Sequence, residues 1–208
     1  MNHLPDFADN HFDLAIVDPP YGIGLDQSTY GSKKERRNGV NKYAPKDWNN
    51  KIPDGEYFDN LYRISKHQII WGCNFYNKYI RDVGRIVWDK VIQNHVFSHV
   101  DIASCSKFNV NRIYRQMWVG FTAKEKDEER IHPTQKPVQL YRWLLKNYAK
   151  PGDLILDTHV GSGSSLVACI IEGFDYVGYE IDKEYYDGAM KRIRAEQSKI
   201  DMFAPVML

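Results

Sequence analysis

The stretch LILDTHVGSGSSLVACIIEGFDYVGYE, residues 154–180, decides the fold. Its first three residues, Leu154-Ile155-Leu156, form a short apolar run typical of a buried strand, and the sequence after Gly163 has helical character to about Glu172. A second strand is expected at Tyr176–Tyr179. The alternation of strand, helix and strand predicts a βαβ unit with parallel strands, and therefore an α/β fold.

The loop inside this stretch, residues 157–163, has the pattern of a ligand-binding turn. Its glycines let the backbone approach a ligand, and free amides at the start of the following helix point into a cleft. Glu180 ends the next strand, 23 positions beyond Asp157, where a carboxylate can accept hydrogen bonds from ribose hydroxyls. A nicotinamide enzyme would fit equally well, and a tight glycine turn without a ligand is a further alternative. Asp157 favours S-adenosylmethionine, because an acid repels a pyrophosphate but attracts an ammonium and a sulfonium.

A second apolar run, Leu14–Val17, ends in Asp18-Pro19-Pro20-Tyr21. An exocyclic amino group on a base is a poor nucleophile, because its lone pair is delocalised into the ring. A carboxylate at Asp18 and the carbonyl of Pro19 can accept both N–H hydrogens and turn the lone pair toward an electrophile. Successive prolines stiffen the loop and lack a competing N–H. The ring of Tyr21 offers a surface on which a base can stack.

Further elements follow from the periodicity of the remaining sequence. Strands are expected at Gln68–Trp71 and Arg85–Trp88, and both suit a parallel sheet. Helices are expected at residues 57–64, 138–148 and 183–197. With 208 residues, 43% of them hydrophobic, the chain is expected to form a single domain over 1–208. Three tryptophans are expected in its core: Trp71, Trp88 and Trp143.

Three motifs in a fixed order carry a family resemblance. Asp18 to Tyr21, His132 to Pro137 (HPTQKP) and Asp157 to Gly163 resemble the DPPY, HPTxKP and FxGxG motifs of amino-group DNA methyltransferases. Because the catalytic motif comes first, the order is similar to the permuted β-group of that family, over most of residues 12–195. The DPPY motif alone is less specific, since RNA and protein methyltransferases also contain it.

The resemblance implies an architecture and a set of site residues. The fold would be a doubly wound, mostly parallel, Rossmann-like sheet in circularly permuted motif order, with the two loops on neighbouring strands. The implied catalytic residues are Asp18, Pro19, Pro20 and Tyr21. The implied cofactor-binding residues are Asp18, His132, Thr134, Lys136, Asp157, Thr158, His159, Gly161, Ser162, Gly163, Glu180 and Ile181.

The chain departs from the family pattern at two places. His159 stands where the family has a phenylalanine over the cofactor. A separate target-recognition domain is missing as well, because only residues 109–131 are available for it, too few for an independent domain. We therefore expect relaxed sequence specificity, reading by a basic loop, or reading by a partner subunit.

Two segments are candidates for contact with DNA. Residues 25–50 lack helical or strand periodicity and are expected to form a mobile basic loop; as an alternative, such a loop is simply solvated. Residues 109–131 are expected to be a minimal target-recognition insertion, a small excursion from the core in which Tyr114 and Trp118 stack on bases. The candidate DNA-binding residues are Lys33, Lys34, Arg36, Arg37, Arg112 and Arg115, with Gln116 as a further reader.

Composition excludes several other classes. Cys73, Cys105 and Cys169 lie far apart, so neither a disulfide framework nor a zinc site is expected. His95 and His99 lack a neighbouring acid in a metal motif, and no metal is expected. Since no apolar stretch approaches the length of a membrane span, a soluble, cytoplasmic protein is expected. The net charge of +1 says little about partners.

The resemblance implies a site-specific DNA adenine-N6 methyltransferase that takes its methyl group from S-adenosylmethionine and flips the target adenine out of double-stranded DNA. A compact phage or mobile-element enzyme, as in restriction-modification, fits the size. Cytosine-N4 methylation is the first alternative, although serine is commoner than Asp18 in that branch. A catalytically silent DNA-binding subunit is the second, and an RNA or protein methyltransferase the third. A homodimer is left open.

Overall fold

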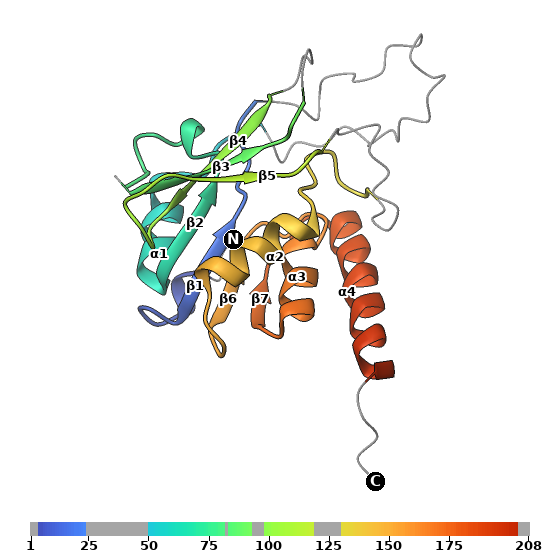
Figure 1. Ribbon diagram of the computed structural model, residues 1–208. Coiled ribbons are helices and arrows are strands. Elements are labelled where there is room, and N and C mark those ends of the chain that lie inside the picture. Colours follow the sequence, from blue (N-terminus) through green and yellow to red (C-terminus); the bar gives the residue numbers. More distant parts are fainter. Residues whose placement is uncertain (1–3, 24–49, 82, 93–97, 119–129, 204–208) are drawn as a thin grey trace.

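In the computed structural model, the described residues are 4–23, 50–81, 83–92, 98–118 and 130–203, and they form a seven-stranded sheet with helices packed against it (Figure 1). The sheet order is β5-β3-β4-β2-β1-β6-β7. The strands are β1 (Phe12–Val17), β2 (Ser65–Trp71), β3 (Gly84–Asp89), β4 (Val100–Cys105), β5 (Arg112–Arg115), β6 (Leu154–Asp157) and β7 (Asp175–Gly178). The helices are α1 (Gly55–Ile64), α2 (Val138–Tyr148), α3 (Ser164–Glu172) and α4 (Lys183–Phe203), with 3-10 turns η1 (Leu4–Asp6) and η3 (Cys73–Phe75).

The predicted βαβ unit is confirmed as β6, α3 and β7, whose two strands pair in parallel. β1 lies between β2 and β6 and is parallel to both, so the strands that precede the Asp18 loop and the glycine loop are neighbours. The expected helices are present, and the last one, α4, continues beyond residue 197 to Phe203. The α/β class and the mostly parallel sheet are therefore as predicted.

The far side of the sheet differs from the expectation. The strands predicted at residues 68–71 and 85–88 are present as β2 and β3, but they are not adjacent, because β4 lies between them and is antiparallel to both. β4 was not predicted. Its sequence, VDIASC, combines an acid with three small residues, so its hydrophobic pattern carries no strand signal.

Part of the 109–131 segment also belongs to the sheet. Residues 112–115 form β5, an edge strand parallel to β3, so the expected excursion from the core is wrong for these residues. Trp118 is 8% exposed and packs in the main core cluster, which contradicts a role in stacking on bases. Tyr114 packs against Trp143, with ring centroids 5.0 Å apart. Residues 119–129 lie outside the described part of the chain.

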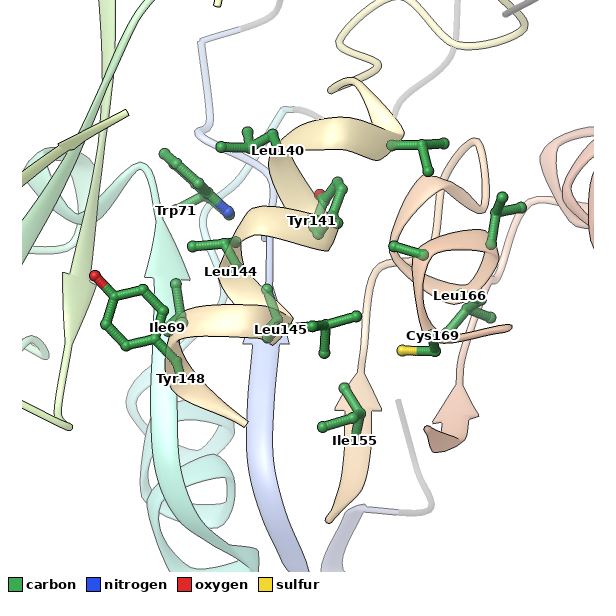
Figure 2. Close-up of a cluster of buried hydrophobic side chains, with 14 of the residues drawn as sticks. Ile69, Trp71, Leu140, Tyr141, Leu144, Leu145, Tyr148, Ile155, Leu166 and Cys169 are labelled. Atoms are coloured by element: carbon green, nitrogen blue, oxygen red, sulfur yellow. The ribbon is translucent and has the colours of Figure 1, made fainter. Parts of the chain in front are cut away.

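Hydrophobic layers cover both faces of β1, which explains its continuous apolar sequence. Ala15 and Val17 belong to the cluster that contains the buried side of α1. Leu14 and Ile16 belong to the cluster that contains α2 and α3. Figure 2 shows the apolar side chains of α2 lying over the sheet between β2 and β6. Each fully buried leucine of this kind stabilises the fold by about 1.5–3 kcal/mol.

Candidate active site

The Asp18 loop begins directly after β1 and is held by side chains from other elements. Asp18 accepts a hydrogen bond through Oδ1 from the Tyr21 hydroxyl at 2.6 Å. The hydroxyl of Tyr76, which follows η3, donates to the carbonyls of Pro19 at 2.5 Å and Pro20 at 2.9 Å. The prolines have no N–H of their own, but the Tyr76 hydroxyl occupies one acceptor position of the Pro19 carbonyl. A carbonyl oxygen has two lone pairs, so one remains for a second donor.

The segment after β2 forms a support for the Tyr21 ring. Gly72 has a φ of +68°, and a Cβ at this position would collide with the Tyr21 ring, so glycine is required on both counts. Phe75 stacks on Tyr21 with centroids 4.8 Å apart and an interplanar angle of 11°. Burial raises the pKa of Tyr21 well above its usual value, and the nearby charge of Asp18 raises it further. Tyr21 is thus a neutral ring with one face already covered.

Lys136, for which the resemblance implied a cofactor contact, lies at the Asp18 loop. Its ammonium forms an ion pair with Oδ2 of Asp18. It also donates to the Tyr21 hydroxyl at 3.1 Å. The side chain is 3% exposed, so a charged group is held inside the protein beside the predicted catalytic carboxylate. The HPTQKP segment therefore reaches the Asp18 loop.

His132 and Thr134, from the same segment, lie beside the glycine loop. The His132 ring would be 3.6 Å from a Cβ at Gly161, and it contacts the Tyr185 ring with centroids 4.3 Å apart. Nδ1 of His132 is 3.2 Å from the Thr134 hydroxyl and accepts from the Thr134 amide at 3.3 Å. Residues 132–136 thus connect the two loops that the sequence keeps far apart.

The glycine loop is built around a buried carboxylate. Asp157 is 1% exposed; its Oδ1 accepts from the His159 amide at 2.9 Å, and its Oδ2 accepts from the Ser165 hydroxyl. Burial raises the pKa of Asp157 to about 7, against the lowering effect of these hydrogen bonds, and the charges of Asp18 and Glu180 raise it further. The three carboxylates therefore share one electrostatic environment, which favours a cationic ligand.

Glu180 closes the other side of the loop. Its carboxylate accepts from the Gly161 amide at 2.7 Å and from the Asp182 amide at 2.8 Å. Burial raises the pKa of this carboxyl above its usual value. Ile181 follows with its side chain 85% exposed, an unusual position for an isoleucine. An acid beside an exposed apolar surface suits a ribose joined to a flat base.

His159 and Thr158 lie against α1. The Thr158 hydroxyl is 2.7 Å from the Tyr57 hydroxyl and 2.9 Å from Nδ1 of His159. The His159 ring meets the Tyr57 ring edge to face, at 5.5 Å. Burial lowers the pKa of His159 to about 3, so the imidazole is neutral near pH 7. A neutral ring preserves much of the apolar character of the phenylalanine that the family has here.

Sequence reasoning missed three residues that hold these loops. Tyr76 binds the proline carbonyls, Asp101 at the start of β4 lies 4.0 Å from Lys136, and Arg192 of α4 donates to the Ser162 carbonyl at 2.6 Å. A signal existed for Tyr76, because residues after the end of a buried strand lie at the edge where α/β proteins bind ligands. Asp101 and Arg192 lie in segments whose sequence carries no comparable signal.

The predicted DNA-contacting residues are only partly within the described chain. Arg112 and Arg115 lie on the edge strand β5 with exposed side chains, and Arg115 pairs with Asp89 at 3.1 Å. The candidates between residues 25 and 50, namely Lys33, Lys34, Arg36 and Arg37, lie outside the described residues. Within the described ranges there is no cluster of metal-ligating side chains, and none of the helices there is long and apolar enough to cross a membrane.

Comparisons with known proteins show which proteins this chain resembles. A family model described as DNA methylase, of the N6/N4 type, matches residues 93–191. The type II methyltransferase M.HpaI of Haemophilus parainfluenzae is 28% identical over 243 aligned positions, which cover 95% of this chain and 73% of that protein.

Solved structures share the fold. The complex of M1.HpyAVI with SAM (S-adenosylmethionine) has a TM-score of 0.56 at 17% identity, covering 92% of this chain and 94% of that one. The cytosine-N4-specific PvuII DNA methyltransferase has a TM-score of 0.58 at 11% identity, covering 96% and 87%. The chain is thus similar to N6/N4-type DNA methylases over residues 93–191 and to the type II methyltransferase M.HpaI over most of its length, and it shares the fold of the solved structures.

Proposed function

We propose that the protein transfers a methyl group from S-adenosylmethionine to the N6 amino group of adenine in double-stranded DNA. The observation that carries this proposal is the braced Asp18 loop, in which a carboxylate and the Pro19 carbonyl lie together at the end of β1. The neighbouring strand, β6, ends in the acidic glycine loop. Two reactants bound at adjacent strand ends would meet over one edge of the sheet.

The residues of the glycine loop fit the cofactor. Gly161 and Gly163 have φ values of +53° and +79°, which open the backbone at the start of α3. Glu180 and the exposed Ile181 suit the ribose and the adenine, and the carboxylates of Asp157 and Asp18 suit the positive charges. When bound, S-adenosylmethionine supplies an electrophilic methyl group on a sulfonium.

The Asp18 loop activates the acceptor. The amino group donates one N–H to the Asp18 carboxylate and the other to the free lone pair of the Pro19 carbonyl, which localises the nitrogen lone pair. As the N–C bond forms, the electrons of the S–C bond remain on sulfur. The nitrogen then loses one proton, which Asp18 is positioned to accept. Tyr21 and Phe75 form the aromatic support against which the flipped base stacks.

Several finer assignments belong to this proposal. The Asp18 motif precedes the glycine loop in the chain, which supports the permuted β-group order, within one methyltransferase domain over residues 1–208. Residues 109–131 would serve as a reduced target-recognition region, with Arg112 and Arg115 of β5 meeting phosphates or base edges. Lys33, Lys34, Arg36 and Arg37 would add phosphate contacts.

The test is transfer of a radiolabelled methyl group from S-adenosylmethionine to unmethylated duplex DNA, followed by mass spectrometry of the nucleosides. The expected product is N6-methyladenine. N4-methylcytosine would contradict the acceptor while preserving the enzyme class. Labelled RNA or protein in place of DNA would contradict the substrate, and cofactor binding without transfer to any acceptor would support the silent-subunit alternative.

A further inference from the structure

We propose that Lys136 is a positioning residue of the acceptor site, which orients the Asp18 carboxylate and the Tyr21 hydroxyl and is itself anchored by Asp101. This inference deepens the proposed function and rests on it. It differs from the cofactor contact that the family resemblance implies for Lys136. The proposal concerns the orientation of the groups that receive the target amine, and it predicts a loss of transfer rate with cofactor affinity retained.

The contacts of Lys136 form a closed cycle with the catalytic loop. Its Nζ is paired with Oδ2 of Asp18 and donates to the Tyr21 hydroxyl at 3.1 Å. Tyr21 in turn donates to Oδ1 of Asp18 at 2.6 Å. Both carboxylate oxygens are therefore held, which fixes the plane of the group. Each oxygen retains a second lone pair, so the carboxylate can still accept an N–H from a substrate.

The surroundings of Lys136 are built for a buried ammonium. A charge that is 3% exposed requires compensating groups, because desolvation of an ion is costly. Asp101 supplies a second carboxylate, 4.0 Å from Nζ, and Lys90 pairs with the other oxygen of Asp101 at 2.7 Å. Four side chains of alternating charge thus extend from the catalytic loop to the end of β3: Asp18, Lys136, Asp101 and Lys90.

Aromatic rings enclose the same ammonium. Nζ lies 5.7 Å from the centroid of the Tyr21 ring and 5.4 Å from that of Trp71, within the range of cation–π attraction. Of these two rings, Tyr21 belongs to the Asp18 loop and Trp71 to the core beneath it. The His132 and Thr134 side chains, four and two residues earlier, are the ones that lie beside the glycine loop.

A misplaced carboxylate should slow the chemical step. Displacement of a reacting group by about 1 Å costs roughly 100-fold in rate, even when the change lies outside the reacting atoms. Without Lys136, the Tyr21 hydroxyl is the one remaining side-chain contact of the Asp18 carboxylate among the described residues, and the carboxylate can rotate away from the amine. Cofactor affinity should change little, because Glu180 and the glycine loop keep their own hydrogen bonds.

The experiment compares variants of the full chain by single-turnover transfer to unmethylated duplex DNA and by calorimetric titration with S-adenosylmethionine. Lys136→Met is expected to transfer about 100-fold more slowly, with the cofactor Kd within about threefold of wild type. Lys136→Arg should restore part of the rate. Added methylammonium should partly rescue Lys136→Ala, which a purely structural role would not allow. Lys146→Met is the matched control, since this lysine is half-exposed and pairs with Glu172 outside the site.

Three outcomes would overturn the proposal. The first is an unchanged transfer rate in Lys136→Met. The second is a cofactor Kd that rises as much as the rate falls, which would place Lys136 in the cofactor site. If Lys136→Met does not fold, Asp101→Asn is measured in its place. Transfer that is roughly tenfold slower at unchanged Kd would support Asp101 as the anchor of Lys136. An unchanged transfer rate in Asp101→Asn is the third contrary outcome. A wild-type chain that transfers no methyl group would overturn the proposed function itself, and this inference with it.

Discussion

The loops that follow β1 and β6 are neighbours in space but are held in different ways. The Asp18 loop is fixed by side chains far along the chain: Tyr76 binds the Pro19 carbonyl from 57 positions away, and Lys136 binds Asp18 from 118 positions away. The carboxylates of the glycine loop are bound by residues nearby in the chain, although the Tyr57 hydroxyl also contacts Thr158 from 101 positions away. Asp157 accepts hydrogen bonds from residues two and eight positions ahead, and Glu180 binds an amide 19 positions back.

Substitutions should therefore disturb the two halves of the site, the Asp18 loop and the glycine loop, separately. The glycine loop belongs to one βαβ unit and should keep its shape when the other loop is disturbed. The Asp18 loop depends on contacts between distant elements, so single substitutions there should affect methyl transfer more than cofactor binding. The following substitutions test that separation.

Asp18→Ala is expected to have the largest effect. It removes the carboxylate that is proposed to accept the amine hydrogen, and such groups contribute about 100- to 1,000-fold to the rate. We expect transfer to fall about 1,000-fold, with the cofactor Kd within a few fold. Asp59→Ala, at an exposed position of α1, is the control. Equal loss of transfer and of cofactor binding would show that Asp18 mainly builds the cofactor site.

Glu180→Ala should affect the other half of the site, the glycine loop. The variant loses the proposed ribose contact and two hydrogen bonds to loop amides. Hydrogen bonds to a charged group contribute about 1.5–3 kcal/mol, so the Kd for S-adenosylmethionine should rise about 10- to 100-fold. At saturating cofactor, transfer should recover most of its rate. Calorimetry checks the first part, and an unchanged Kd would remove the proposed contact.

Tyr76→Phe should disturb the Asp18 loop less than Asp18→Ala does. The variant keeps the ring but loses the hydroxyl that binds two proline carbonyls. We expect transfer about tenfold slower and the free energy of unfolding lower by about 1–2 kcal/mol. Tyr62→Phe is matched, because its hydroxyl also donates to a carbonyl, that of Tyr79, away from the site. If the transfer rate fell by the same factor in both variants, the slower transfer of Tyr76→Phe would result from lower stability of the fold and not from the position of the Asp18 loop.

Asp157→Asn should have the smallest effect on transfer at saturating cofactor and a visible effect on stability. The pKa of Asp157 is about 7 in the fold, above the ordinary value of 3.8, so the native state binds this proton more tightly than the unfolded state does. Its contribution to stability is therefore full below about pH 4 and is lost as the pH rises through about 7. Urea unfolding from pH 4 to 8 should show this decline in wild type and a flatter profile in Asp157→Asn. Parallel profiles would contradict the prediction.

The sequence predicted well the parts that local patterns determine. β1, β6, α2 and the βαβ unit follow from apolar runs and glycines that act over a few residues. The adjacency of the Asp18 and glycine loops was implied by the family resemblance, and the pairing of β1 with β6 agrees with it. Long-range pairings had no such signal. Nothing in the sequence of β4 shows that it inserts between β2 and β3, and nothing near Lys136 shows that it pairs with Asp18.

The reversed direction of β4 determines where a functional side chain can stand on that strand. Parallel strands present their last residues at the ligand edge of a sheet, as β1 does with Asp18. β4 begins at that edge, so Asp101, its second residue, stands beside the last residues of its neighbours. A search for site residues that follows only the strand ends would pass over it. In a sheet with one antiparallel member, the entry of that strand is the equivalent place to search.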